Sequence, residues 1–201
     1  MVVFGGYSTS NGHLNELWIF DLHVLSWSCP EYFGNPPSKR RGHGAAIVRD
    51  KMYIFGGFDG TLHLNDLHCI DLQSWSWVLL DMKGGPSPRR HHVMEVVGDH
   101  IVVYGGFDGE KYLEDVYSFD VKTNIWTCWH VLRPCISSAN NIGGNGTMIG
   151  RSLHTMTFHK RRLIVFGGVH GGGSLQDVLY LESVAGKRLL KPQFVLRILR
   201  S

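Results

Sequence analysis

The pentapeptide Gly-Gly-Phe-Asp-Gly occupies residues 56–60 and occurs again at residues 105–109 of this 201-residue chain. Residues on both sides of it recur at the same spacing of 49 positions. The pairs related in this way are Arg40 and Arg89, His43 and His92, Leu64 and Leu113, Asp66 and Asp115, Asp71 and Asp120, and Trp77 and Trp126. Because glycine, charged and aromatic residues all keep one ungapped spacing, the chain uses the same structural unit more than once.

Two further copies of this unit extend the repeat in both directions. A shift of 62 positions from Arg89 and the other repeated residues of its copy leads to Arg151, His154, Gly167, Gly168, Leu175 and Asp177. A partial copy upstream contains Gly5, Gly6, Asn15, Leu17, Asp21 and Trp27. The first copy has no Arg-x-x-His segment, and the last has Arg188 where the tryptophan is expected. The sequence therefore holds about four copies, and the outer two are incomplete.

Each copy has the pattern of four short strands. In the second copy, residues 43–49, 51–57, 64–71 and 74–80 are rich in apolar, β-branched and aromatic residues and are separated by turn signals. No segment shows a sustained period of about 3.6 residues with helix caps. We therefore predict an all-β chain.

The repeated residues suit particular places in such a unit. A glycine pair can turn sharply or let two backbones approach closely. Asp71 and its equivalents can cap the N–H groups of a tight turn. Trp27, Trp77 and Trp126 are large enough to fill the wedge between neighbouring sheets. Arg40 can hydrogen-bond carbonyl groups where the chain passes from one unit to the next.

The combination of Arg-x-x-His, Gly-Gly, Asn-Asp-Leu and an aspartate six residues before a tryptophan, seen within residues 40–77, resembles the kelch-repeat proteins. The resemblance covers residues 1 to about 182 and implies a kelch-type β-propeller with about four blades, incomplete at both ends. The expected parts are a partial blade at 1–32, blades at 40–81 and 89–131, a partial blade at 151–182, a Gly/Asn/Ser-rich inserted loop at 133–149 and a basic tail at 183–201 outside the repeat pattern.

Four blades are few for this family, whose propellers usually have about six or seven. Three interpretations remain open. The chain is a fragment of a larger propeller, or a small propeller in which the tail supplies the strand missing from the first blade, or a partial ring that associates with another chain through open blade edges. The tail segment 193–199 alternates enough to form a strand.

Charge and cysteine content narrow the function classes. The formal net charge is +3, but five of the 20 Lys and Arg residues lie in the last 19 residues, which contain no acid. The remainder has a slight acidic excess, so a nucleic-acid partner is not expected. We see no apolar run long enough for a membrane span. The four cysteines show no zinc-site spacing, which favours free thiols and a cytoplasmic location, with the nucleus possible.

Candidate partner-binding residues lie in two classes of loop. Phe58 and Phe107 follow glycine pairs and stand beside Asp59 and Asp108, a combination of aromatic and acid suited to protein or peptide contact. The same Phe-Asp-Gly sequence also suits a tight turn by itself. In the loops between copies, Arg41, Arg90 and His91 follow the repeated arginines; the two arginines are free to bind an acidic motif.

These features favour a non-catalytic protein–protein interaction module without a cofactor, acting as an adaptor or scaffold. Ubiquitin-ligase substrate recognition and trafficking or cytoskeletal scaffolding are the leading roles that the resemblance implies. The alternative is a metal-assisted propeller enzyme of the specifier-protein or galactose-oxidase kind. Three of the 12 histidines, His43, His92 and His154, repeat with the blades, which marks them as scaffold, and no HExxH spacing occurs. We therefore expect no enzyme activity and no metal site.

Overall fold

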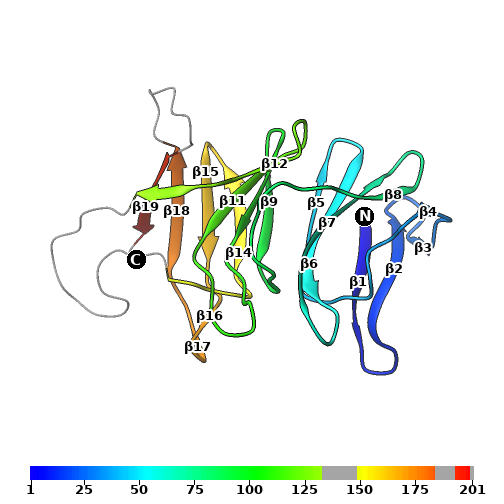
Figure 1. Ribbon diagram of the computed structural model, residues 1–201, viewed down its shortest axis with the longest axis horizontal. Coiled ribbons are helices and arrows are strands. Elements are labelled where there is room, and N and C mark those ends of the chain that lie inside the picture. Colours follow the sequence, from blue (N-terminus) through cyan, green and yellow to red (C-terminus); the bar gives the residue numbers. More distant parts are fainter. Residues whose placement is uncertain (133–148, 184–192, 200–201) are drawn as a thin grey trace. The chain divides into compact units, whose positions relative to one another are not determined.

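The computed structural model describes residues 1–132, 149–183 and 193–199 (Figure 1). All regular structure in these residues is β-strand, which confirms the predicted all-β class. Almost all of the predicted inserted loop, and residues 184–192 and 200–201 of the tail, lie outside the described residues. The chain forms two compact units. Unit 1 comprises Met1–Asp81 and Ser87–Arg90, and unit 2 comprises Met82–Pro86 and His91–Ser201.

Unit 1 begins with a three-stranded antiparallel sheet in the order β1-β2-β3. Its strands are β1 (Val2–Ser8), β2 (Gly12–Asp21) and β3 (Ser26–Ser28). The register between β1 and β2 shifts between Phe4 and Gly6, where the chain reaches its glycine pair. Asp21 closes the turn that follows, because its Oδ1 accepts the N–H of His23 at 2.7 Å.

The second sheet of unit 1 is built from the first complete repeat, with strand order β4-β8-β7-β6-β5. The strands are β4 (Phe33–Gly34), β5 (Gly44–Val48), β6 (Lys51–Phe58), β7 (His63–Asp71) and β8 (Ser76–Leu79). Asp71 Oδ1 accepts the N–H groups of Gln73 and Ser74, both at 3.0 Å. The aspartate therefore caps the turn between β7 and β8, as predicted.

Unit 2 contains a four-stranded antiparallel sheet in the order β12-β11-β10-β9. Its strands are β9 (Val93–Val97), β10 (His100–Tyr104), β11 (Val116–Asp120) and β12 (Ile125–Cys128). Asp120 repeats the role of Asp71, since its Oδ1 accepts the N–H of Lys122 at 2.8 Å. The repeated aspartate thus makes the same turn in both units.

The fourth sheet, also in unit 2, has the order β13-β19-β18-β15-β14. Its strands are β13 (His130–Leu132), β14 (Thr155–His159), β15 (Arg162–Phe166), β18 (Val178–Ser183) and β19 (Gln193–Leu199), and a small hairpin of β16 (Val169–His170) and β17 (Gly173–Ser174) lies between β15 and β18 in the chain. The tail strand β19 pairs antiparallel with β18. It holds the place beside β18 that β8 and β12 hold in their own sheets, so it completes the fourth sheet and does not add to the first.

The core of unit 1 lies between its two sheets. Buried apolar side chains meet there from β1, β2, β6, β7 and β8; they are Phe4, Leu17, Met52, Ile54, Ile70 and Trp77. The rings of Trp77 and Phe4 approach to 5.3 Å between centroids, and Trp77 is only 3% exposed. Trp77 therefore fills the wedge between sheets, as the sequence predicts.

Trp27 departs from that prediction, because it is 51% exposed and contacts Phe20 of its own sheet. Trp77 is buried by the sheet that precedes its own. Within unit 1, no second sheet covers Trp27 in this way. The structure therefore shows the wedge contact for Trp77 and does not show it for Trp27, although the two residues occupy the same place in the repeat.

The core of unit 2 lies between the third and fourth sheets. It is formed by Val102, Tyr104, Val116, Trp129, Leu163, Val165, Leu179 and Leu181. Trp129 has no counterpart in the sequence repeat. Its Nε1–H donates to Ser118 Oγ at 2.7 Å, which satisfies the polar atom of an otherwise apolar ring in the core.

The repeated arginines connect neighbouring sheets. Within unit 1, the N–H of Arg40 donates to Leu14 O and its carbonyl accepts the N–H of Gly6, both in the first sheet. Its fully buried guanidinium reaches the second sheet, where it donates to Gly56 O at 3.0 Å and to both oxygens of Asp66 at 2.6 and 2.8 Å. One residue therefore joins two sheets through its backbone and its side chain.

Arg151 repeats this arrangement in unit 2. Its backbone bonds Leu113 and Gly106, between β10 and β11 of the third sheet, and its guanidinium donates to Gly167 O and to Asp177, between β15 and β18 of the fourth. Burial and the Arg151 guanidinium together keep the nearby imidazole of His154 uncharged. Burial, assisted by Arg151, lowers the pKa of His154 to about 3. The repeated histidine is therefore a neutral part of the scaffold at physiological pH.

The glycine pairs allow these close backbone contacts. Gly57 has φ +105°, and a Cβ there would lie 3.0 Å from Arg41 O and 3.0 Å from His43 Cβ. We expect Gly57→Ala to lower the free energy of unfolding by about 1–3 kcal/mol, through backbone strain and the steric clash. Urea denaturation measures the change. Gly12→Ala is the matched control, because Gly12 also has positive φ but open space around it. Equal losses in the two variants would contradict a role for close approach at Gly57.

Candidate partner-binding loops

Paired aromatic rings stand at the ends of three hairpins. In each, the residue after the glycine pair lies opposite the residue before the repeated leucine. The ring pairs are Tyr7 with His13 at 5.2 Å, Phe58 with His63 at 5.0 Å and Phe107 with Tyr112 at 5.1 Å. Antiparallel pairing places such side chains on one face, so each pair follows directly from the hairpin register.

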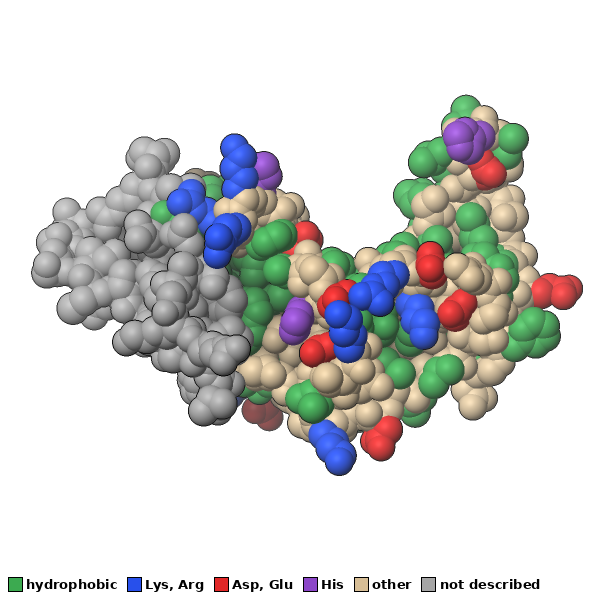
Figure 2. Space-filling model, turned by 90° about the horizontal axis from the view of Figure 1, so that it is seen from above, with side chains coloured by type: hydrophobic (Ala, Val, Ile, Leu, Met, Phe, Trp, Pro, Cys, Tyr) green, Lys and Arg blue, Asp and Glu red, His purple; other side chains and the backbone are tan. Residues whose placement is uncertain are grey.

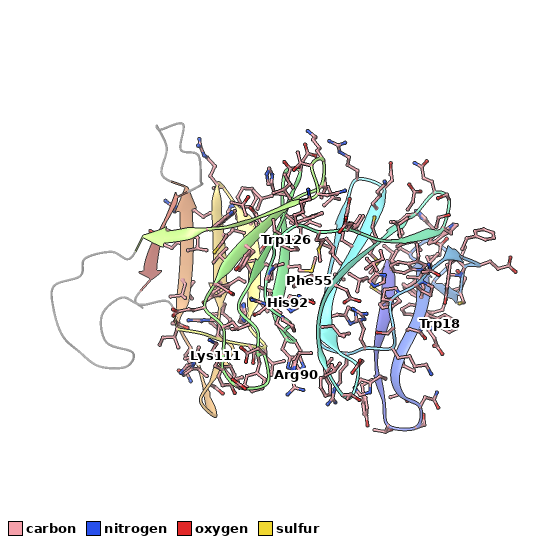
Figure 3. All side chains as sticks on the ribbon, viewed as in Figure 1. Trp18, Phe55, Arg90, His92, Lys111 and Trp126 are labelled. Atoms are coloured by element: carbon pink, nitrogen blue, oxygen red, sulfur yellow. The ribbon has the colours of Figure 1, made fainter. Side chains whose placement is uncertain are left out.

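Phe58 is the centre of a cluster in unit 1 that also contains two arginines. Its backbone exchanges two hydrogen bonds with Arg41, at 2.9 and 3.0 Å. The guanidinium carbon of Arg41 lies 4.9 Å from the Tyr7 ring centroid and 5.9 Å from that of Phe58. Arg90, labelled in Figure 3, lies 5.0 Å from the same Phe58 centroid. Both guanidinium groups are thus within cation–π range of the aromatic ring.

Arg41 carries a charge that the described residues do not neutralise. It has no carboxylate partner among residues 1–132, 149–183 and 193–199, and its Nε is buried without a hydrogen-bond acceptor there. The Tyr7 and Phe58 rings contact the guanidinium through its carbon atom, and its N–H groups can still donate hydrogen bonds. A planar donor of this kind is suited to a carboxylate.

Asp59, beside Phe58, is occupied by the turn itself. Its Oδ1 accepts the N–H groups of Thr61 and Leu62, both at 2.8 Å. These hydrogen bonds, from Leu62 and Thr61, lower the pKa of Asp59 below its usual value. The alternative interpretation of Phe-Asp-Gly as turn chemistry therefore describes the carboxylate of Asp59, whereas the ring of Phe58 takes part in the cation–π cluster.

In unit 2, Phe107 continues into a row of three rings. Phe107 contacts Tyr112, and Tyr112 contacts His170 at 5.3 Å between centroids. His170 Nδ1 lies 2.6 Å from Gly150 O and donates to it. Asp108 closes the same loop, because its Oδ1 accepts the N–H groups of Glu110 at 2.9 Å and Lys111 at 2.8 Å. Burial opposes the shift, but the N–H groups of Lys111 and Glu110 lower the pKa of Asp108.

The structure divides the predicted site residues between the two units. Phe58, Asp59 and Arg90 belong to unit 1, where Phe58 and Arg90 are in contact. His91, Phe107 and Asp108 belong to unit 2. His91 has φ +55°, and its carbonyl accepts the N–H of Leu153 at 3.0 Å, so its backbone helps to join the third and fourth sheets.

The sequence profile of the KLHDC2/KLHL20/DRC7 Kelch-repeats domain matches residues 1–141, more than two thirds of the chain. The chain belongs to the kelch-repeat family. This confirms the family resemblance, and the all-β sheets are those of a partial kelch-type β-propeller. Membership of this family points to a module for protein interaction.

Individual kelch relatives are similar over shorter stretches. The chain is 40% identical to acyl-CoA-binding domain-containing protein 4 of Arabidopsis thaliana over 87 residues, 38% of this chain and 13% of that protein. It is 36% identical to kelch domain-containing protein 3 of Bos taurus over 84 residues, 41% of this chain and 22% of that protein. It is 36% identical to kelch domain-containing protein 2 of Bos taurus over 74 residues, 37% of this chain and 18% of that protein. The matches therefore cover less than a quarter of each of these relatives.

Five residues whose rings take part in these loop contacts were not predicted as site residues. They are Tyr7, His13, His63, Tyr112 and His170. A signal for the hairpin pairs is present in the sequence: His13, His63 and Tyr112 all stand immediately before the repeated leucine. No comparable signal exists for His170, because it packs on Tyr112 from a different sheet.

The described residues contain neither a cluster of metal-binding side chains nor a membrane-spanning helix. Across residues 1–132, 149–183 and 193–199, no group of three His, Cys, Asp or Glu side chains could hold a metal ion. Within those ranges there is also no helix of the length and hydropathy needed to cross a membrane. Cys29, Cys69 and Cys128 are free thiols.

Proposed function

We propose that this chain is a non-catalytic protein–protein interaction module that acts as an adaptor or scaffold. Its partner-binding residues are Phe58, Asp59, Arg90, His91, Phe107 and Asp108, to which Arg41 is added. In unit 1, the Arg41 guanidinium receives a carboxylate from an acidic segment of the partner, while Tyr7 and Phe58 supply apolar contact. Free thiols support a cytoplasmic or nuclear setting for this interaction.

The observation that supports this proposal is the guanidinium of Arg41, which lies within cation–π range of two rings and has no carboxylate partner in the described residues. Arg40, the next residue, shows the contrasting case, because its guanidinium is fully buried and paired with Asp66. The two adjacent arginines therefore have separate roles: Arg40 joins the sheets, and Arg41 faces the loop cluster. Aromatic side chains and arginine are also the residues that contribute most to binding energy at protein interfaces.

An array of immobilised ten-residue peptides tests the proposal, with one to three Glu residues in an alanine background and a matched set in which Gln replaces every Glu. We expect the chain to prefer the Glu peptides to the Gln peptides. Arg41→Gln should weaken binding of the Glu peptides by about 10-fold or more, since a hydrogen bond to a charged group contributes about 1.5–3 kcal/mol.

Lys39→Gln is the matched control, because it removes the same charge from an exposed position in the same linker. It should leave the preference for Glu peptides intact. Equal losses in Arg41→Gln and Lys39→Gln would mean that net charge, and not the stacked guanidinium, attracts the peptides. Equal binding of Glu and Gln peptides by the unaltered chain would also overturn the proposal.

A further inference from the structure

The cation–π cluster of unit 1 brings three nitrogen-bearing side chains to one aromatic ring. The guanidinium carbons of Arg41 and Arg90 lie 5.9 and 5.0 Å from the Phe58 ring centroid. The imidazole of His13 lies 5.9 Å from the same ring, measured between centroids. All of these residues belong to unit 1. We name these four residues and Tyr7, which contacts both His13 and Arg41, the Phe58 cluster.

The imidazole of His13 is positioned in this cluster by two neighbouring segments. Register places His13 on β2 opposite Tyr7 on β1, and their rings lie 5.2 Å apart between centroids. The imidazole also reaches the turn after Phe58, because a Cβ at Gly60 would lie 3.1 Å from His13 Cε1. The guanidinium of Arg41 contacts the same Tyr7 ring, at 4.9 Å from its centroid. A cation and a titratable ring therefore contact the same pair of aromatic side chains.

Two polar atoms of the Phe58 cluster have no hydrogen-bond partner among residues 1–132, 149–183 and 193–199. They are Arg41 Nε and His13 Nε2, and both are buried. The Nε of a guanidinium always carries a proton, and Nε2 of an imidazole carries one in the donor tautomer and in the charged form. Buried polar groups are almost always hydrogen-bonded in folded proteins, so two such atoms in one cluster favour an acceptor supplied by a bound partner.

No ion pair within the described residues balances Arg41 or His13. Asp59 is the acid nearest to Phe58 in the sequence, but its Oδ1 accepts two N–H groups of its own turn. Elsewhere basic side chains have acidic neighbours, and Figure 2 shows Lys and Arg side chains interspersed with Asp and Glu on one face of the molecule. The positive charge of Arg41 is therefore left for an anion from outside this part of the chain.

A phosphate monoester matches these donors better than a carboxylate does. A carboxylate has two acceptor oxygens and one charge, whereas phosphoserine and phosphothreonine have three acceptor oxygens and a charge of about −1.5 to −2 at pH 7. We infer that the acidic residue that the Phe58 cluster binds most tightly is a phosphorylated serine or threonine of the partner. Its phosphate accepts hydrogen bonds from Arg41 and His13, and Arg90 supplies a second positive charge. This inference rests on the proposed function, because it names the acidic group that the same site receives.

Three ten-residue peptides in an alanine background test the inference, with phosphoserine, Glu or Ser at one central position. Fluorescence anisotropy of each labelled peptide, titrated with the full chain, measures its dissociation constant. We expect the phosphoserine peptide to bind about 10-fold or more tightly than the Glu peptide, because it accepts more charge-assisted hydrogen bonds, and the Ser peptide to bind least. Inorganic phosphate at the concentration of the peptide should not displace it, since the rest of the peptide contacts Tyr7 and Phe58.

Two variants separate phosphate recognition from the binding of any acidic residue. Arg90→Gln removes the second charge, and His13→Phe removes the imidazole nitrogens but keeps an aromatic ring. Each should reduce the advantage of phosphoserine over Glu to about 3-fold or less, whereas Arg41→Gln should weaken the binding of both peptides. Lys39→Gln and His23→Phe are the matched controls, because both residues are exposed and lie outside the Phe58 cluster, and they should keep the full advantage. Circular dichroism checks that each variant keeps its strand content.

Three results would overturn the inference. The first is a phosphoserine peptide that binds no more tightly than the Glu peptide while Glu peptides are still preferred to Gln peptides; the proposed function would then hold with a carboxylate as its ligand. The second is an equal weakening of both peptides in Arg90→Gln and His13→Phe, which would assign these residues to packing. The third is displacement by an equal concentration of inorganic phosphate, which would make the cluster a site for the free anion only. If the chain binds neither the Glu nor the phosphoserine peptide, the proposed function fails together with this inference.

Discussion

Replacing Arg40 by alanine is expected to lower the free energy of unfolding by about 3–5 kcal/mol, because it leaves the half-buried Asp66 carboxylate without its main partner and removes a fully buried guanidinium. The guanidinium donates to both oxygens of Asp66, at 2.6 and 2.8 Å, and also to Gly56 O. Urea denaturation at pH 7 measures the loss. Lys39→Ala, at an exposed neighbouring position, should change stability little.

The pH dependence of stability distinguishes the ion pair from simple loss of packing at Arg40. Partial burial alone would raise the pKa of Asp66, but hydrogen bonds from Arg40 and His68 outweigh it and hold this pKa well below its ordinary value of 3.8. A lowered folded-state pKa stabilises the fold above the unfolded pKa, and that stability is lost as the pH falls below about 4. Arg40→Ala should therefore show a smaller loss of stability between pH 7 and pH 3 than the unaltered chain.

A double-mutant cycle with Asp66→Asn provides the contradicting outcome. If Arg40 and Asp66 stabilise the fold as a pair, the double variant should lose clearly less than the sum of the two single losses. Strict additivity would mean that Arg40 acts through Gly56 and the backbone of the first sheet, and that its contact with Asp66 contributes little.

The repeat predicts those parts of the fold that depend on local chemistry. The Asp71 turn is determined by residues two and three positions away, so the aspartate and its spacing identify it. Gly57 follows from the same logic, because only a residue without Cβ tolerates its φ of +105°. The Arg-x-x-His segment marks the connection between sheets, although its bidentate contact with Asp66 requires knowledge of which strands become neighbours.

Features that depend on distant segments are less visible in the sequence. The fourth sheet receives β19 from the tail, and its pairing with β18 becomes apparent only from the register. Trp27 has the same sequence context as Trp77 but a different exposure, because Trp77 is buried by Phe4 and Leu17, which belong to another repeat. A pattern identifies the residue suited to a contact but does not supply the surface that contacts it.

The candidate site shows the same limit. Phe58 and Arg90 were both predicted from their loops, but their contact at 5.0 Å joins residues 32 positions apart. The pairing of Arg41 with Tyr7 likewise requires the first sheet to lie beside the linker that follows it. Sequence spacing predicts the aromatic and cationic character of these loops, whereas the stacking geometry arises from the neighbouring sheets.

Trp77→Ala is expected to lower the free energy of unfolding by about 3–5 kcal/mol, since the change removes a large ring from the core between two sheets. Trp77 is 3% exposed and packs on Phe4, with Met52, Ile54 and Ile70 in the same cluster. The first sheet of unit 1 is held to the second by this cluster and by the Arg40 connection. The variant should therefore also increase hydrogen exchange in β1 and β2 relative to β6.

Trp27→Ala is the matched control for Trp77→Ala, because the two tryptophans hold the same place in the repeat but differ in burial. With half of the Trp27 side chain already in solvent, its removal should cost about 1 kcal/mol or less. Thermal or urea denaturation of both variants gives the comparison. Similar losses would show that contacts within the tryptophan's own sheet, which both positions share, determine how much the tryptophan contributes to the free energy of unfolding. A loss confined to Trp77→Ala assigns that contribution to the neighbouring sheet that covers it.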